Sequence, residues 1–447
     1  DEWNATNRLH LSLGLRWDLN PPPTGRPQPY TLDQITNLAT TQLAPGGTPL
    51  WHTDYRGFAP RIGLAYQLRQ SPGHETVIRA GFGVFYDVGN FAALNGLYGG
   101  IGVGSQITYA NVPFPFTPAQ QILPAPSVAS PYTKTVSAAD PRLRLPYTLE
   151  WNGAIQQGLG RNQTFTVSYV ASGGRKLLHD AFLYPPDNPG FALENGLYLL
   201  TNGSTSSYNS LQVQFQRSLS HGLQALASYT WSHAIDDLSS NQNFEATLLR
   251  GNADFDVRHS FSAALTYDVP GSYANPFADA LLKHWAIDLR QTARSALPVD
   301  IYYGYGALPD GQQVYIRPDL VPGVPIYLSD PTAPGGRVVN INAFTEAPGG
   351  VNGDAPRNFV RGFAAWQTDL AIRREFPLPE GLNLQFRAEA FNIVNHPNFG
   401  TIDNFITDGP ALFGRANSTL NNSLGGLNAL YQMGGPRSLQ LALRLQF

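Results

Sequence analysis

Two neighbouring motifs bring together the residue types of a serine hydrolase. SHAIDD (232–237) and DFDVRHS (254–260) supply serine, histidine and aspartate, which elsewhere form a nucleophile, its base and the group that orients the base. The chain has no G-x-S-x-G nucleophile elbow. Ser232 and His233 are neighbours in an expected strand, so their side chains point to opposite faces. We therefore expect no catalytic residues and no enzyme, and interpret these residues as shaping the base of a loop.

Other ligand-binding patterns are incomplete. GGIGVG (99–104) resembles a phosphate-binding glycine loop, but no helix follows it to supply free N–H groups. The acidic pairs Asp236–Asp237 and Asp254/Asp256 leave a calcium ion at a loop rim as a lesser alternative, because they fall short of the roughly six to eight oxygen ligands that calcium takes. The histidines lack H-x-x-x-H and H-E-x-x-H spacing, and there are no cysteines. We expect neither a metal site nor a cofactor.

Composition and charge exclude several classes of protein. The 44 glycines and 36 prolines among 447 residues follow no G-x-y period, so the chain is not collagen, and 12% aromatic residues is too many for a disordered chain. A net charge of −3 argues against a nucleic-acid partner. Charged residues make up 14% and the mean hydropathy is −0.20, a polar but weakly charged composition that is uncommon in soluble proteins of this size.

Alternation of apolar and polar residues is the dominant pattern. In the last segment, Leu439, Leu441, Leu443, Leu445 and Phe447 share one face of an expected strand. Most segments of this kind run for about 9–13 residues, the length that a tilted membrane strand requires. We predict twelve strands, near residues 7–17, 58–68, 76–87, 145–157, 162–170, 208–218, 221–232, 257–268, 283–294, 366–376, 381–393 and 437–447.

The connections between these segments alternate in length. Links 69–75, 158–161, 219–220 and 377–380 are short and 269–282 is moderate, whereas 18–57, 88–144, 171–207, 233–256, 295–365 and 394–436 are long. Outer-membrane barrels have short periplasmic turns and long extracellular loops. The pattern predicts an all-β fold, an antiparallel transmembrane β-barrel, with Phe447 at its periplasmic edge. Within 295–365 we expect a short extra hairpin, near 299–305 and 313–317.

The polar face of these strands carries charges of both signs. Because each arginine or lysine at mid-bilayer would cost about 2–4 kcal/mol, this face must line the lumen of a membrane barrel. The predicted lumen-facing charged residues are Arg61, Arg79, Glu150, Asp288, Asp369, Arg373, Arg387, Glu389 and Arg444. Arg374 is the misfit, since it falls on the apolar face, near an end where it can snorkel to headgroups.

Aromatic residues gather where the expected strands end. Trp17, Tyr86, Tyr147, Tyr208, Trp231 and Trp366 lie near the outer ends, and Tyr66, Tyr267, Phe376 and Phe447 lie near the inner ends. Amphipathic rings favour the two headgroup interfaces of a bilayer. We interpret these residues as aromatic girdles.

Several stretches resemble the C-terminal barrel of the large Oar-like TonB-dependent receptors of acidobacteria. They are RLHLSLGLRWD (8–18), FAPRIGLAYQL (58–68), VIRAGFGVFYD (77–87), SYTWSHAIDD (228–237), DFDVRHSF (254–261) and RAEAFNIVNHPNFG (387–400). Phe447 resembles the C-terminal signal that the barrel-assembly machinery recognises. The resemblance covers residues 1–447 and implies a barrel of about 22 strands, of which about 12 are seen here. It also implies that a plug and other N-terminal domains, which would engage the TonB complex, are missing from this chain.

Three functional hypotheses remain. The first is an outer-membrane receptor and transporter barrel for TonB-dependent uptake of a scarce, bulky extracellular ligand, embedded in lipid and lipopolysaccharide of the bacterial cell outer membrane. The second is a self-contained passive porin or adhesin-like barrel of about 12 strands. The third is a soluble all-β carbohydrate-binding or hydrolytic protein, against which the apolar face argues.

Overall fold

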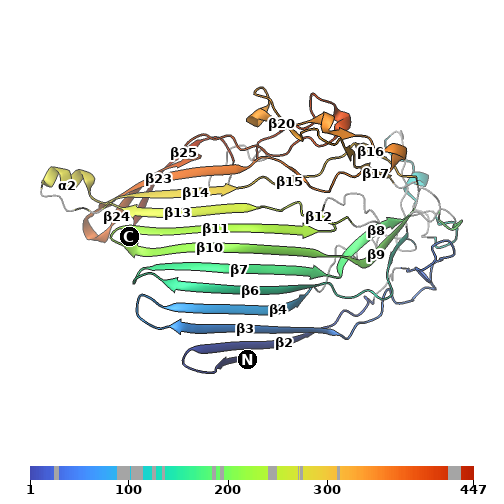
Figure 1. Cartoon of the computed structure of the whole chain (residues 1–447), viewed down its shortest axis with the longest axis horizontal. Coiled ribbons are helices and arrows are strands. Elements are labelled where there is room, and N and C mark those ends of the chain that lie inside the picture. The colour runs from blue at the N-terminus through green and yellow to red at the C-terminus, as the bar shows by residue number, and fades with distance from the viewer. Residues whose placement is uncertain are drawn as a thin grey trace.

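One antiparallel sheet dominates the structure, and its strands follow one another in chain order (Figure 1). A computed structural model describes residues 1–24, 30–87, 101, 114–122, 127–132, 136–183, 188–191, 196–239, 249–269, 271, 275–309, 313–420 and 434–447. The sheet contains β1 (Glu2–Asn4), β2 (Leu9–Asp18), β3 (Gly57–Arg69), β4 (Thr76–Tyr86), β6 (Tyr147–Gly158), β7 (Gln163–Arg175), β10 (Ser206–Ser220), β11 (Leu223–Asp236), β12 (Gly251–Asn252), β13 (His259–Asp268), β14 (Trp285–Arg294), β23 (Ala365–Pro377), β24 (Asn383–Phe391) and β25 (Ser438–Gln446).

All twelve predicted strands are confirmed, and the main differences lie at their ends. β7 continues to Arg175, which pairs with Tyr147, although Gly173 and Gly174 interrupt the alternation there. β10 and β11 likewise continue to the pair Ser206–Asp236. Backbone pairing rather than side-chain pattern determines where these strands end.

The predicted closed barrel is not observed. Within the described residues the sheet is open, with β1 and β2 at one edge and β25 at the other. β1 pairs with β2 over three residues, and β25 pairs with β24. The sheet therefore presents two edges that a closed barrel would join.

The two ends of the sheet differ, as the connection lengths predicted. Short turns join the strands at one end, which also holds the C-terminus, and the long connections gather at the other (Figure 1). The tightest turn has His221 at φ 53° and Gly222 at φ 74°, a pair of left-handed residues that matches the twist of a two-residue hairpin. The moderate link 269–282 contains the helix α2 (Pro276–Leu282), which projects beyond the short-turn end. Among the described residues, no helix is long and apolar enough to cross a bilayer.

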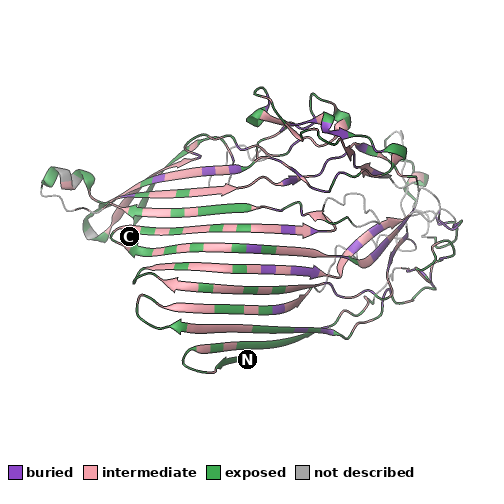
Figure 2. Cartoon of the chain, viewed as in Figure 1, coloured by how far each residue is buried: buried purple, intermediate pink, exposed green. Residues whose placement is uncertain are grey.

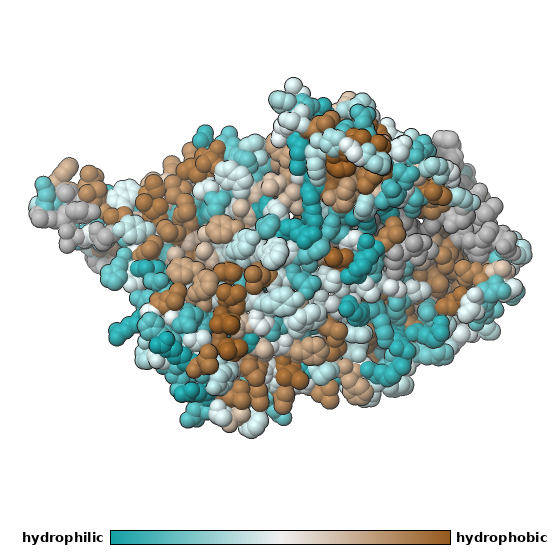
Figure 3. Space-filling model, in the orientation of Figure 1, coloured by the Kyte–Doolittle hydropathy of each residue, from teal (hydrophilic) through white to brown (hydrophobic). Residues whose placement is uncertain are grey.

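The register separates an apolar face from a polar face across the whole sheet. Leu13 pairs with Ile62, Ile62 with Phe82, and Phe82 with Trp151, so large apolar side chains continue from strand to strand. Exposed members of this face are Leu13, Leu15, Trp17, Phe58, Ile62, Phe82, Ile155, Phe165, Tyr169, Leu211, Tyr229, Trp231, Phe261, Tyr267, Ile287, Ile372, Phe376, Leu439, Leu441, Leu443 and Leu445. Most residues of the main sheet are exposed or half-buried rather than buried (Figure 2), and hydrophobic residues form broad surface patches (Figure 3). A water-soluble protein would not leave so much apolar surface uncovered.

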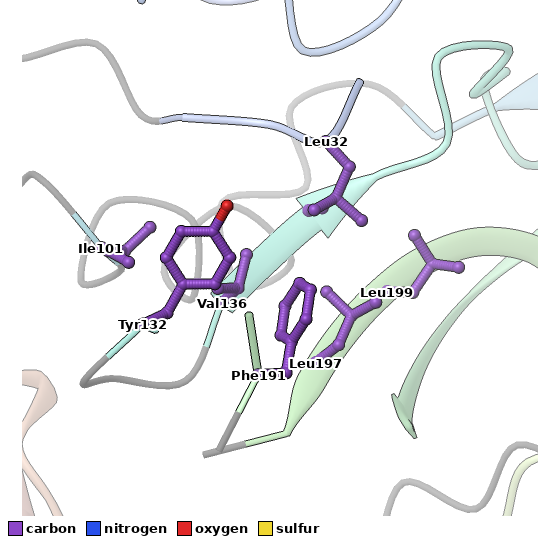
Figure 4. Close-up of a cluster of buried hydrophobic side chains, with 8 residues drawn as sticks. Leu32, Ile101, Tyr132, Val136, Phe191, Leu197 and Leu199 are labelled. Carbon is purple, nitrogen blue, oxygen red and sulfur yellow. The ribbon is translucent and has the colours of Figure 1, made fainter. Parts of the chain in front are cut away.

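The buried cores lie at the long-loop end. β5 (Val136–Ala139), β8 (Leu177–Leu183) and β9 (Leu197–Ser204) form a small sheet that the sequence analysis treated as loop. Val136 and Leu197 pack beside Tyr132 and Phe191, whose ring centroids are 5.1 Å apart (Figure 4). A second cluster, around Leu50, joins this sheet to the preceding loop.

A second loop assembly is built from short strand pairs. Its strands are β15 (Pro298–Val299), β16 (Gly304–Ala307), β17 (Gln313–Ile316), β18 (Asp319–Leu320), β19 (Tyr327–Ser329), β20 (Arg337–Val339), β21 (Phe344–Thr345) and β22 (Val360–Arg361). The predicted extra hairpin is confirmed as β16–β17, with its first strand later than expected. The 3-10 helices are η1 (Pro118–Gln121), η2 (Pro334–Gly336), η3 (Ile341–Ala343), η4 (Pro348–Gly350), η5 (Pro379–Gly381) and η6 (Ile406–Asp408). Phe413 and Ile301 are buried at the centre of this assembly.

Buried ion pairs fasten the second loop assembly to the sheet. The Arg357 side chain, 2% exposed, donates to Asp236 Oδ1 at 2.7 Å at the end of β11. Asp256, fully buried, accepts from Arg361 at 2.5 Å and pairs with Arg258 at 3.0 Å. Between Arg357 and Arg361 in the chain, Asn358 adopts φ 55°, and its side chain donates to Asp254 at 2.6 Å. The segment 357–361 is therefore held by residues of the two motifs that had suggested a hydrolase.

Removing the buried Arg357–Asp236 pair should lower the free energy of unfolding far more than removing the exposed Arg250–Asp237 pair. Arg357→Leu leaves the Asp236 carboxylate without its buried partner, and we expect the free energy of unfolding to fall by about 3–5 kcal/mol. Arg250 pairs with the adjacent Asp237 at 3.3 Å but is 50% exposed, so Arg250→Leu should cost less than about 1 kcal/mol. Urea unfolding in detergent micelles, with limited proteolysis of the 295–365 loop, measures both. Equal effects of the two variants would show that this pair does not anchor the loop.

Asp180 in β8 should make the small sheet of β5, β8 and β9 less stable as pH rises. Burial raises the pKa of Asp180 to about 6, so the folded state keeps a proton that the unfolded state has released. Stability then falls between about pH 4 and about pH 6 and stays low above that range. Asp180→Asn cannot ionise, and should increase hydrogen-exchange protection of β9 at about pH 8 while leaving it unchanged at about pH 4. The same gain at both pH values would contradict a protonated Asp180.

Candidate functional site

All nine predicted lumen residues lie on the polar face of the sheet. Arg61 pairs with Gly83, and Gly83 with Glu150; Asp288 pairs with Ala371, and Ala371 with Glu389. The same parity holds for Arg79, Asp369, Arg373, Arg387 and Arg444. That this face lines a lumen stays a prediction.

Several of these charges pair across neighbouring strands. Arg373 donates to Asp268 at 2.8 Å and lies 3.5 Å from Asp288. Arg387 also lies 3.5 Å from Asp288 and donates to Glu389 at 2.8 Å. Arg373, which also lies 3.7 Å from Glu375, thus contacts three carboxylates and Arg387 contacts two, in a line that crosses β13, β14, β23 and β24. Such pairing lowers the cost of holding charges on a partly enclosed face.

Three of the remaining predicted charges on this face have separate contacts. Arg79 donates to Gln156, and the Arg61 guanidinium lies 4.4 Å from the centroid of the Phe85 ring. Asp369 accepts from Gln367 at 2.7 Å and from the Asn392 amide at 2.9 Å. These contacts fix the side chains in place without gathering them into one catalytic group.

Arg374 lies on the apolar face, as predicted. Its guanidinium is 5.3 Å from the Trp285 ring centroid and 4.7 Å from that of Phe376. Aromatic faces stabilise a cation where water is scarce. Snorkelling to headgroups stays a prediction, but these two rings explain how an arginine is tolerated here.

The prediction that Tyr208 belongs to an aromatic girdle is wrong. Tyr208 pairs with Ser172 and Ala234, which places it on the polar face. In β10 the odd-numbered residues form the apolar face, and Tyr208 is an even-numbered residue of the same strand. Trp17, which stacks on Phe58 at 6.0 Å, and Trp366, which stacks on His396 at 4.2 Å, lie on the apolar face.

The hydrolase residues do not assemble a triad. The Ser232 hydroxyl donates to the Val257 carbonyl at 2.6 Å, and the His233 ring lies 3.0 Å from the Asn252 side-chain oxygen. Asp236 is held by Arg357. These residues shape the base of a loop, as the sequence analysis expected. Of the glycine run 99–104, all but Ile101 lies outside the described residues.

The acidic pairs do not form a calcium site. Asp237 accepts from the Thr205 amide at 2.7 Å, while Asp254 and Asp256 are bound by Asn358 and by arginines. Their oxygens are thus already engaged by donors. Within the part of the chain that the structure describes, no three histidine, aspartate or glutamate side chains form a group suited to a metal.

The second loop assembly encloses a pocket of about 730 Å³, which we call the loop pocket. Its walls are Asp254, Arg294, Leu297–Asp300, Tyr302, Asn358, Gly362, Phe363, Phe399–Phe405 and Asn417–Leu420. Tyr302 lies 5.6 Å from Phe405, and Phe363 lies 5.1 Å from Phe399, centroid to centroid. Sequence reasoning missed this pocket. The aromatic and amide residues of PNFGTIDNF (397–405) were its one visible signal.

Two carboxyl groups in the loop pocket are shifted towards their neutral form. Burial raises the pKa of Asp300, although Arg317, 3.7 Å away, opposes the change. Burial also raises the pKa of Asp403, and the nearby Asp408 carboxylate adds to the shift. The loop pocket thus combines aromatic walls with hydrogen-bonding side chains, an arrangement that suits an organic ligand with a few polar groups.

Solved structures of similar fold are outer-membrane proteins. The outer membrane transporter YddB from Escherichia coli has a TM-score of 0.51 at 11% identity, covering 98% of this chain and 43% of its own. The pyoverdine outer membrane receptor FpvA from Pseudomonas aeruginosa has a TM-score of 0.49 at 12% identity, covering 100% of this chain and 41% of its own. This chain thus spans less than half the length of each. At such identities the likeness concerns the fold alone.

The family assignment comes from the sequence. No curated protein matches the chain. The family described as outer membrane beta barrel domain matches residues 1–440, nearly the whole of it. Together with the two-faced antiparallel sheet, this match shows that the chain belongs to the outer membrane beta barrel domain family and resides in the bacterial outer membrane.

Proposed function

We propose that residues 1–447 form the C-terminal barrel portion of a TonB-dependent receptor of Oar-like type, which takes up a scarce, bulky substrate. The loop pocket carries this proposal. Its volume of about 730 Å³ lies within the range of small-molecule sites, about 300–1,000 Å³. It is built on a folded assembly fixed to the strand ends by buried ion pairs. A preformed pocket of this kind supports capture of a specific ligand before transport.

The sheet supports the transport step. Its apolar face suits lipid, and its paired charges suit a water-filled or plugged lumen. The open edges of β2 and β25 suit further strands that complete a barrel of about 22. No covalent chemistry is required: a plug domain, pulled by the TonB complex, would open the lumen to the bound substrate. The solved protein YddB is described as a transporter, which agrees with this proposal.

Phe447 supports assembly in the same membrane. Its side chain is 101% exposed at the short-turn end and continues the apolar face of β25. An aromatic side chain exposed in this way is accessible to the barrel-assembly machinery. The cell would then insert the barrel with its short turns towards the periplasm.

The proposal predicts a closed, TonB-binding protein. The full gene product, purified in detergent and placed in planar lipid bilayers, should pass no steady ionic current because a plug fills its lumen. It should also bind the purified periplasmic domain of TonB in a pull-down. A matched product without the segment that precedes Asp1 should lose TonB binding and conduct.

A passive porin or an adhesin-like barrel gives the opposite result. A steady open conductance from the full product, without binding to TonB, would contradict the receptor and support the porin. A gene that encodes only a signal peptide before Asp1 would contradict it equally, because no plug or TonB-binding segment would then exist.

A further inference from the structure

Basic side chains surround a small pocket at the long-loop end of β3, β4, β6 and β7. The pocket, of about 180 Å³, is lined by Asp54, Arg56, Tyr86, Arg144, Tyr147 and Lys176 among others. Asp54 and Arg56 precede β3, Tyr86 ends β4, Arg144 precedes β6, and Lys176 follows β7. Four separate segments therefore contribute to one site, which we call the rim site.

The rim site has more positive than negative charge. Three cationic side chains line it against one carboxylate, that of Asp54. Asp54 pairs with Arg56 at 2.8 Å and with Arg144 at 3.5 Å. Burial lowers the pKa of Lys176, and the charge of Arg144 lowers it further. An anion bound here would relieve this repulsion.

The Asn202 side chain holds the backbone of two of the cationic residues in place. Asn202, in β9, accepts from the Arg144 amide at 2.6 Å and donates to the Arg144 carbonyl at 2.9 Å. The same side chain donates to the Lys176 carbonyl at 2.7 Å. Lys176 itself adopts φ 51° and extends over the Tyr147 ring, 5.9 Å from its centroid. The backbone positions of Arg144 and Lys176 are thus fixed before any ligand arrives, which lowers the entropic cost of binding.

The rim site adjoins the lipid-facing side of the sheet. Tyr86 and Tyr147 pair with each other and belong to the apolar face, two residues along from Val84 and Leu149. The neighbouring Trp17 and Phe58 stack on each other and are 54% and 53% exposed. The Trp17 indole donates to the Tyr55 carbonyl at 2.9 Å, which joins this aromatic pair to the segment that carries Asp54 and Arg56. Exposed aromatic rings of this kind mark the depth of lipid headgroups.

We propose that Arg56, Arg144 and Lys176 bind a phosphate group of an anionic lipid headgroup in the outer leaflet. Guanidinium groups present paired donors that match phosphate oxygens, and a lysine adds a compact charge. The apolar face below the rim site would contact the acyl chains of the same lipid. This site is separate from the loop pocket and rests on the outer-membrane location alone, so lipid binding and TonB binding can fail independently.

Native mass spectrometry of the full gene product tests the proposal. The probes are lipid A with two phosphates, the same lipid without phosphates, and inorganic phosphate. We expect the diphosphorylated lipid to bind, and the triple variant Arg56→Gln, Arg144→Gln, Lys176→Gln to weaken its Kd at least about tenfold. Arg142→Gln is the matched control, since Arg142 pairs with Asp140 at 3.6 Å two residues from Arg144 and should leave the Kd unchanged.

Three results would overturn the proposal: equal affinity of the triple variant, equal binding of the lipid without phosphates, or displacement of the lipid by an equimolar amount of inorganic phosphate. The last would indicate a site for free phosphate instead. Heat-modifiable migration on a gel verifies that each variant is folded. If the triple variant does not fold, Lys176→Gln alone should weaken binding several-fold, and an unchanged Kd for that variant would overturn the proposal.

Discussion

Backbone hydrogen bonds inside a bilayer have no water to replace them, and the rest of this structure depends on that constraint. Strands satisfy it by continuous pairing with their neighbours. The pairing from β2 to β25 is almost unbroken, with register shifts in the main sheet at Gln67/Arg69 and at Arg217/Ser220. Because side chains alternate along each strand, one register fixes both faces at once. The same constraint requires pairing partners for the two edges of the sheet inside a membrane.

Beyond the membrane the stabilising interactions change. The long loops form their own cores around Val136 and Phe413 and are joined to the strand ends by buried pairs such as Arg357–Asp236. Breaking such a pair is costly because the loops exclude water from it, so the remaining charge would stay buried without a partner. The two candidate ligand sites follow from this arrangement. The loop pocket lies within the second loop assembly. The rim site lies at the long-loop ends of β3, β4, β6 and β7.

The sequence predicts those parts of the structure that have a local period. All twelve strands of the main sheet that the sequence predicts and the common face of the nine charged residues follow from alternation alone. The loop sheet of β5, β8 and β9 was missed because its short strands lie in segments without a sustained period. The partnership of Arg357 and Asp236 joins residues 121 apart in sequence, so no local pattern indicates it. The contacts of Asn202 with Arg144 and Lys176 likewise join residues far apart in sequence, and only the fold shows them.

The assignment of lipid to one face and water to the other is the central claim, and spin labelling of β25 tests it most directly. The chain has no cysteine, so single cysteines at positions 439–446 of the full product in lipid vesicles can each carry one nitroxide. We expect dissolved oxygen to reach labels at 439, 441, 443 and 445, and a water-soluble nickel chelate to reach those at 440, 442, 444 and 446. Reversed phases, or equal access of both reagents along the strand, would contradict it.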